Sequence, residues 1–200
     1  MTKNYDQMAE EIRQQFRDAP HVGIIGSVSL RHPDSRETCC EIGRALAGIP
    51  DLVVVTGGAD GAADLIARAY DDACRDAGRK GRVLHILPEG SGTREYGDII
   101  HAGADAEQRR EVLGRTASMF IVVEGSPGTV HETEIAVAHQ ALLLPIGRLG
   151  GHAADIYSWQ GCPENMDSAS WFTLGSDTAS HKDVAQAVCL AVESMQLIPA

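Results

Sequence analysis

Short apolar runs alternate along the sequence with longer segments whose apolar residues recur every three or four positions. This alternation limits the possible fold more than any other feature of the chain. The runs are continuous and rich in Val, Ile and Leu, as expected for strands that are buried on both faces of a parallel sheet. The predicted strands are VGIIGSV from Val22, DLVVVTG from Asp51, RVLHILP from Arg82, SMFIVVEG from Ser118 and ALLLPIG from Ala141, with a late edge strand near Trp171 to Leu174.

The segments between the strands predict helices on both faces of the sheet, which is the pattern of an α/β fold. Residues 1–20 predict an additional amphipathic helix, because Tyr5, Met8, Ile12 and Phe16 share one stripe. A length of 200 residues fits one domain. We therefore expect a single Rossmann-like domain over residues 21–200, with an irregular surface or ligand-covering loop from Pro88 to Asp105. The predicted helices run from Ser35 to Ala47, Ala62 to Ala77, Ala106 to Thr116, Val130 to His139 and His181 to Met195.

The composition restricts the classes of partner. The formal net charge is −11, and such a surface disfavours non-specific binding to nucleic acid. No run reaches the roughly 20 apolar residues of a membrane helix, and the polar, acidic start does not resemble a signal peptide. Five cysteines without CxxC spacing fit reduced thiols better than disulfides or zinc, so we expect a cytoplasmic protein without a metal or another cofactor.

Three of the predicted strands end in turns rich in small residues. Gly26 and Ser27 follow the first strand, and Gly57, Gly58 and Gly61 follow the second. The fourth is followed by Gly125, Ser126, Gly128 and Thr129. Because parallel strands end at one edge of a sheet, these turns are expected to meet there and to bind a phosphate through backbone N–H groups and a helix N-terminus. The small-molecule ligand is then expected to be a nucleotide or a sugar phosphate, unless the glycines are only steric requirements of the turns.

Charged residues near the fourth strand add possible chemistry. Glu132 lies one turn after Thr129 and fits either a capping box or a carboxylate that faces the ligand. Arg109 and Arg110 lie on the helix before this strand, either on a solvated face or directed at a phosphate. His131 is a candidate substrate contact, and the histidines have no metal-binding spacing.

These residues together resemble the SLOG superfamily over about His21 to Ser158. The superfamily includes the Lonely Guy phosphoribohydrolases, the molybdenum cofactor carrier proteins and nucleotide-sensing domains of bacterial antiphage systems. Its PGGxGTxxE signature appears as EGSPGTVHE, with Gly128, Thr129 and Glu132 retained. Glu124 replaces the leading proline, and Ser126 replaces the second glycine. An ERK-like element of the hydrolases is similar to Gln108, Arg109 and Arg110.

The resemblance implies that Arg109 and Glu132 cleave the N-glycosidic bond of a nucleoside 5′-monophosphate. It also implies a homodimer, since relatives complete the pocket across a two-fold interface. The segment PIGRLGGHAADIYSW, with Gly150 and Gly151, looks more like sensor-type SLOG domains. The alternatives to a hydrolase are therefore a non-catalytic sensor of an ADP-ribose-like nucleotide and a molybdenum cofactor carrier.

Overall fold

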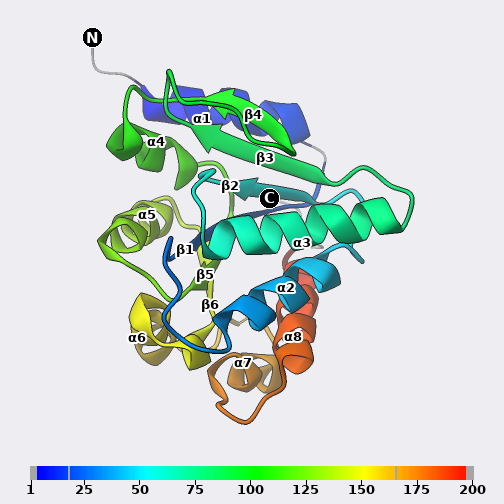
Figure 1. Cartoon of the computed structure of the whole chain (residues 1–200). Coiled ribbons are helices and arrows are strands. Elements are labelled where there is room, and N and C mark those ends of the chain that lie inside the picture. Colours follow the sequence, from blue (N-terminus) through cyan, green and yellow to red (C-terminus); the bar gives the residue numbers. More distant parts are fainter. Residues whose placement is uncertain (1–3, 18, 165, 197–200) are drawn as a thin grey trace.

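A computed structural model describes residues 4–17, 19–164 and 166–196. Its centre is one six-stranded sheet in the order β4-β3-β2-β1-β5-β6, in which every neighbouring pair is parallel (Figure 1). The predicted α/β fold is thus confirmed, and all strands end at the same edge. The strands are β1 His21–Gly26, β2 Val53–Thr56, β3 Arg82–Leu87, β4 Asp98–His101, β5 Met119–Val123 and β6 Leu142–Pro145.

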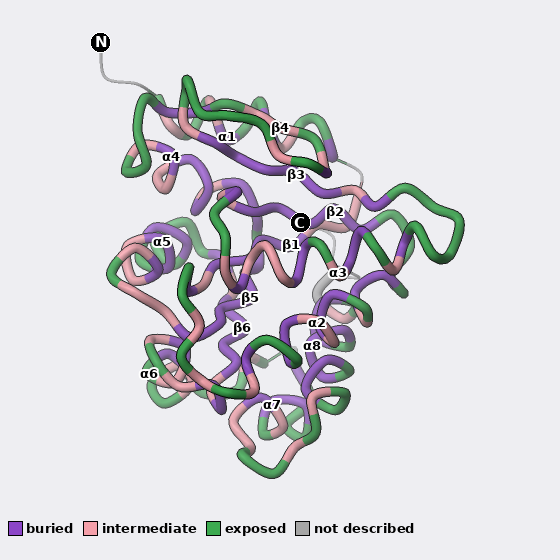
Figure 2. The backbone as a smooth tube through the Cα atoms, in the orientation of Figure 1, coloured by how far each residue is buried: buried purple, intermediate pink, exposed green. Residues whose placement is uncertain are grey.

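Helices cover both faces of this sheet. The face that α2, α3, α7 and α8 cover holds one apolar cluster, and the other face packs against α1, α4, α5 and α6. Figure 2 shows β1, β2, β3, β5 and β6 as mainly buried segments between half-exposed helices, whereas β4 at the edge of the sheet is not buried. The helices are α1 Tyr5–Arg13, α2 Ser35–Leu46, α3 Ala62–Asp76, α4 Ala106–Leu113, α5 Pro127–Ala138, α6 Gly151–Gln160, α7 Ser168–Gly175 and α8 His181–Gln196, with 3-10 turns η1 Gln14–Phe16 and η2 Gly147–Leu149.

The N-terminal helix α1 has the apolar stripe that the sequence predicts. Ala9, Ile12 and Phe16 are buried in the same cluster as the side chains of α4. Polar contacts add to this packing, because Arg115, directly after α4, pairs with Asp6 at 2.9 Å and lies over the ring of Tyr5. Helix α1 therefore supports the helix that carries Arg109 and Arg110.

Two predictions about secondary structure are wrong. The segment near Trp171 to Leu174 is helix α7 rather than an edge strand, because Trp171 and Leu174 are three residues apart and both bury against the body while Phe172 is exposed. The predicted irregular segment from Pro88 to Asp105 contains the edge strand β4, which pairs with β3. Among the described residues, no helix is long and apolar enough to span a bilayer.

Candidate functional site

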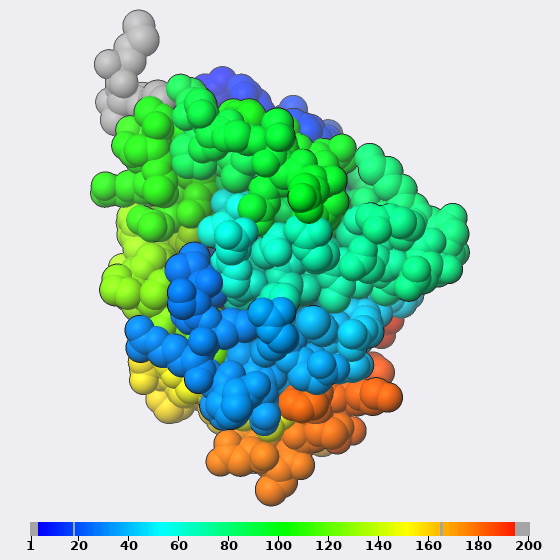
Figure 3. Space-filling model, viewed as in Figure 1, coloured from blue at the N-terminus to red at the C-terminus, as the bar shows by residue number. Residues whose placement is uncertain are grey.

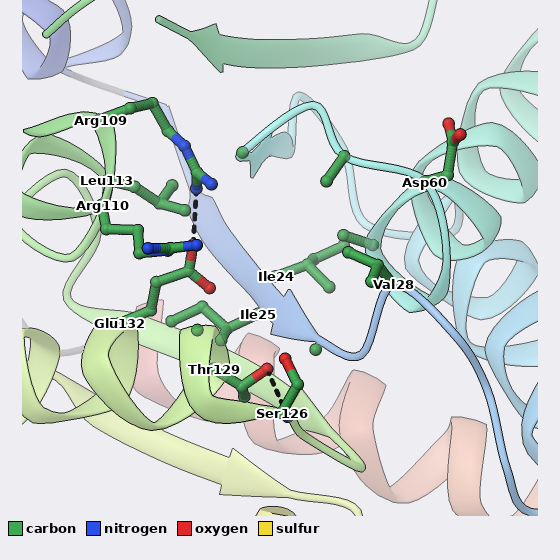
Figure 4. Close-up of a pocket in the computed structure, with 15 residues that line it drawn as sticks. Ile24, Ile25, Val28, Asp60, Arg109, Arg110, Leu113, Ser126, Thr129 and Glu132 are labelled. Carbon is green, nitrogen blue, oxygen red and sulfur yellow. Dashed lines mark hydrogen bonds and ion pairs between the residues drawn. The ribbon is translucent and has the colours of Figure 1, made fainter. Parts of the chain in front are cut away.

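A pocket lies at the carboxyl edge of the sheet, where the turns after β1, β2 and β5 meet (Figure 4). Its volume is about 60 Å³, which is room for several water molecules or for one end of a larger ligand. Figure 3 shows the segment after β1 at the surface between the segment after β2 and α5. The lining residues are Ile24, Ile25, Gly26, Val28, Gly57, Ala59, Asp60, Ala63, Arg109, Arg110, Leu113, Ser126, Gly128, Thr129 and Glu132.

The shortest ion pair of the lining residues joins Arg109 of α4 to Glu132 of α5. The Arg109 Nη1 atom lies 2.6 Å from Glu132 Oε1, and the two residues are 7% and 8% exposed. Arg109 Nε is buried without a hydrogen-bond partner in the described part of the chain. Because a buried ion pair costs desolvation energy that its Coulomb attraction hardly exceeds, this pair is a poor stabiliser and points to a role in ligand chemistry.

Burial raises the pKa of Glu132 above the usual value of a glutamate, whereas the charges of Arg109 and Arg110 and the hydrogen bond from Arg109 lower it. The net direction is upward. Glu132 therefore takes up a proton more readily than an exposed glutamate does, although an arginine is in direct contact with it.

The N-terminus of α5 forms the wall next to this pair. Ser126 is the N-cap residue, Pro127 is the first residue of the helix, and the Ser126 N–H donates to Thr129 Oγ1 at 3.2 Å. The capping role that the sequence allows for Glu132 is therefore wrong, and its carboxylate is free to meet Arg109. The first N–H groups of α5 and its positive dipole end border the pocket, as an anion site requires.

Glycines at two positions allow the arginines to come close to the backbone. A Cβ atom at Gly57 would lie 2.2 Å from Arg109 Nη1, so the arginine packs directly on the turn after β2. A Cβ atom at Gly128 would lie 3.1 Å from Arg110 Nη2. Arg110 is also near Glu132, with 4.0 Å between Arg110 Nε and Glu132 Oε1. Both arginines are thus directed at the pocket rather than at a solvated helix face (Figure 4).

Eight of the predicted site residues line the pocket: Gly26, Gly57, Arg109, Arg110, Ser126, Gly128, Thr129 and Glu132. Ser27, Gly58, Gly61 and Gly125 belong to the same turns but are not among the lining residues, and a Cβ atom at Gly61 would lie 2.2 Å from the carbonyl oxygen of Ser27. His131 is not among the lining residues. Its Nε2 atom lies 3.5 Å from Glu111 Oε1, because neighbouring residues of a helix point about 100° apart.

Sequence reasoning missed the apolar wall opposite the ion pair. Ile24 and Val28 belong to this wall, and Val28 is 57% exposed at the rim. Asp60 also borders the pocket but pairs with Arg94 at 3.1 Å and does not cap α3, whose N-cap residue is Gly61. An apolar wall beside charged groups fits a ligand with a flat or apolar part and an anionic part.

The site has no donor set for a metal ion. No group of three or more His, Cys, Asp or Glu side chains within residues 4–17, 19–164 and 166–196 is arranged to hold one. The five cysteines are free thiols.

The sequence profile of the SLOG cluster4 family matches residues 19–168, which include every residue of the pocket. The chain belongs to the SLOG cluster4 family. Its fold is similar to the X-ray structure of TM1055, a structural genomics target, with a TM-score of 0.59 and 26% identity over 76% of this chain and 88% of the other. The family and the fold support a nucleotide-binding protein of the SLOG type.

Two molybdenum cofactor proteins have the same fold as this SLOG protein. The molybdenum cofactor carrier protein of Chlamydomonas reinhardtii has a TM-score of 0.53 and 18% identity over 62% of this chain and 74% of the other. The molybdenum cofactor binding protein of Rippkaea orientalis has a TM-score of 0.52 and 19% identity, with the same coverages. A search of curated proteins found no match.

Proposed function

We propose that this SLOG protein hydrolyses the N-glycosidic bond of a nucleoside 5′-monophosphate. The observation that carries this proposal is the buried pair of Arg109 and Glu132, which faces a pocket beside the N-terminus of α5. Burial of a carboxylate and an arginine lowers the stability of the folded state. A role of both side chains in hydrolysis explains why they are buried here.

In this proposal, the phosphate of the ligand lies at the start of α5. The N–H groups of the first turn donate to its oxygens, and the helix dipole favours its charge. Arg110 supplies the positive charge next to the phosphate. Its side chain is only partly buried, and because it lies 4.0 Å from Glu132, farther than Arg109 does, it is less tightly paired with that carboxylate. Arg109 then holds the sugar between the phosphate and Glu132, and the apolar wall with Val28 packs on the base.

Glu132 acts on the sugar carbon that bears the base. As the bond from this carbon to the base nitrogen breaks, positive charge develops on the sugar, and an ionised Glu132 stabilises it and orients the attacking water. Water supplies hydroxyl to the sugar carbon and a proton to the leaving base. The products are the free base and ribose 5-phosphate, so atoms and charge balance without a cofactor.

The test is incubation of the protein with a mixture of nucleoside monophosphates, followed by mass analysis of the solution and of the ligand retained by the protein. We expect free base and ribose 5-phosphate from the wild type. Glu132→Gln is expected to lower the rate of base release by about a thousandfold, the range of a lost acid–base group, and to leave nucleotide binding within a few-fold. Glu134→Gln is the matched control, because Glu134 is an exposed glutamate on the same helix. Equal base release by Glu132→Gln and the wild type would refute the proposal.

The second candidate is a non-catalytic binder of a nucleotide signal. It is favoured by the η2–α6 turn, where Gly151 packs on the backbone of Glu124 at the same edge of the sheet. A molybdenum cofactor carrier is a further form of this function, which the similar fold of the molybdenum cofactor carrier protein and of the molybdenum cofactor binding protein supports. An intact ligand that stays on the protein in the incubation would favour binding over hydrolysis.

We also propose that residues 21–200 form the ligand-binding domain, that residues 1–20 are a separate N-terminal helical segment, and that the protein is a homodimer. The pocket reaches the surface, since Val28 at its rim is 57% exposed, and a second copy of the chain would cover it there. Light scattering of the purified protein, with and without AMP, measures the mass. A monomer under both conditions would contradict the dimer.

A further inference from the structure

Glu124 is a buried carboxylate at the end of β5 that the proposed reaction does not use. The residue is 3% exposed and has a backbone φ of 51°, which is unusual for any residue but glycine. It stands where the family signature has its leading proline. An ionisable side chain in this position needs partners, because burial of an unpaired carboxylate is strongly unfavourable.

The hydrogen-bond donors to its carboxylate among the described residues belong to the turn between β1 and α2 and to the first residue of α2. Glu124 Oε1 accepts from the backbone N–H groups of Arg31 and His32, each at 3.0 Å, and from the hydroxyl of Ser35. Glu124 Oε2 also accepts from the Arg31 N–H at 3.0 Å. Ser35 is fully buried and is the first residue of α2.

This arrangement of donors is that of an anion site. Consecutive backbone N–H groups and a hydroxyl at the start of a helix are the groups that hold a phosphate in nucleotide-binding folds. In Rossmann folds, the turn between the first strand and the next helix holds the pyrophosphate of a dinucleotide. Here the corresponding donors surround a carboxylate of the chain itself.

The backbone at Val123 and Glu124 contacts two other turns, the one after β6 and the one after β1. Its carbonyl oxygen accepts from the Ala153 N–H of α6 at 2.7 Å, and a Cβ atom at Gly151 would lie 2.9 Å from its carbonyl carbon. Directly before it, the carbonyl of Val123 accepts from the Ser27 N–H at 3.2 Å. Glu124 thus fixes the turns after β1, β5 and β6 relative to one another.

We propose that Glu124 is a positioning residue that takes the place of a ligand phosphate in the turn between β1 and α2. Its carboxylate holds that turn, which carries Val28 of the pocket wall, and it occupies the donors that a second phosphate would need. The start of α5 stays available for a phosphate of the ligand. The protein therefore selects ligands with a terminal monophosphate over ligands with a pyrophosphate bridge.

The first part of this proposal, the positioning role, is independent of the reaction. The second part, the choice of ligand, rests on the proposed phosphate site at α5. The two parts therefore have separate measurements.

The positioning role is tested by chemical rescue of Glu124→Gly with formate. Glycine accepts the positive φ, so the variant removes the carboxylate without straining the backbone. We expect the Tm of Glu124→Gly to be about 3 °C or more higher in roughly 100 mM sodium formate than in sodium chloride at the same concentration. For the wild type and for Glu134→Gln we expect a difference of less than about 1 °C. The Arg31 and His32 amides are expected to exchange hydrogen faster in Glu124→Gly and to regain protection in formate.

Equal effects of formate on the variant and the wild type, or unchanged exchange of the Arg31 and His32 amides, would overturn the positioning role. Should Glu124→Gly not fold, Glu124→Asn serves in its place, since asparagine tolerates positive φ and carries no charge. Recovery of folded Asn variant in formate alone would support the role, and failure to recover it in either salt would count against it.

The ligand choice is tested by titration calorimetry with AMP and ADP-ribose in a Glu132→Gln background, which is expected to bind nucleotide with little hydrolysis. We expect Glu132→Gln to bind AMP at least about tenfold more tightly than ADP-ribose, and the added Glu124→Gly to reduce this ratio. Equal affinities in Glu132→Gln would overturn the ligand choice. If formate rescues the variant but no nucleotide is hydrolysed, the positioning role stands and the hydrolase proposal falls. If a nucleotide is hydrolysed but formate does not rescue the variant, the hydrolase proposal stands and the positioning role falls.

Discussion

Two buried glutamates lie eight residues apart on the segment from β5 into α5, and their surroundings differ. Glu124 accepts hydrogen bonds from backbone N–H groups and a hydroxyl, and among the described residues no arginine side chain forms an ion pair with it. Glu132 meets the guanidinium of Arg109 at the wall of a pocket. Burial alone therefore does not identify a functional carboxylate, whereas the kind of partner and access to a ligand do.

The difference also concerns what each glutamate leaves for a ligand. The donors around Glu124 are used within the protein. The donors around Glu132 include Arg109 Nε, which has no partner in the described chain, and Arg110, which is only partly buried. One glutamate completes a turn, and the other borders a site that a ligand can complete.

The largest expected effect comes from Arg109→Ala, which breaks the pair at Glu132 and leaves the surroundings of Glu124 intact. Removing one partner of a buried pair is expected to cost about 3–5 kcal/mol of unfolding free energy at pH 8. Arg109 lowers the pKa of Glu132, so its removal raises that pKa further above the ordinary value. A carboxyl whose pKa is raised by folding favours the folded state at low pH, and this contribution is lost as the pH rises through the folded-state pKa.

Urea unfolding at pH 5 and pH 8 measures this effect, and Arg109→Ala is expected to lose less stability at pH 5. Arg109→Ala with Glu132→Gln is the control, because it has no carboxyl to titrate at this site and its loss is not expected to be smaller at pH 5 than at pH 8. An equal loss at both pH values in Arg109→Ala itself would contradict the role of burial at Glu132.

A smaller effect is expected from Gly57→Ala, which displaces Arg109 without removing its charge. The new Cβ atom would lie 2.2 Å from Arg109 Nη1, and the flexible guanidinium is the group that must move. A displacement of about 1 Å in a catalytic group lowers rates by up to about a hundredfold. We expect base release to fall about 10- to 100-fold, with unchanged hydrogen exchange at Arg31. Gly92→Ala is the matched control, since no atom lies within 4 Å of its new Cβ. Full activity of Gly57→Ala would show that the position of Arg109 is not critical.

The smallest effect is expected from Arg110→Gln. Its side chain is 30% exposed and 4.0 Å from Glu132, so its interactions are partly screened by water. Steady-state kinetics are expected to show a rise of KM by about two- to fivefold, with kcat nearly unchanged. Arg36→Gln, an exposed arginine of α2 outside the pocket lining, controls for the change in net charge. A loss of kcat instead would place Arg110 in the chemical step.

The central fold could be predicted because five strands consist mainly of apolar residues, whose burial follows from their own sequence and not from particular long-range contacts. Strand β4 was missed because Ile99 and Ile100 are its only apolar residues and both are half-exposed at the edge of the sheet. Helix α7 was predicted as a strand because Trp171 and Phe172 are good strand formers, but only one of the two faces the core.

Much of the candidate site could also be predicted, since turns that follow parallel strands meet at one edge. The sequence could not show which side of α5 faces the pocket, so it placed His131 with Glu132. Nor could it show the role of Glu124, whose partners Arg31 and His32 are 93 and 92 positions away. Such long-range hydrogen bonds depend on the folded path of the turn after β1, which has no periodic signal.

The parallel sheet separates the core residues, which the fold needs, from the turns at one edge, which can be replaced without changing the core. Its core residues lie along the strands and helices, whereas the pocket is confined to one edge, where the turns after β1, β2 and β5 meet β1, α3, α4 and α5. A protein engineer could therefore exchange these turns for others of equal length and redirect the scaffold to a new small molecule. The residue to carry along in any such exchange is Glu124, because the exchanged turns would still need a common anchor.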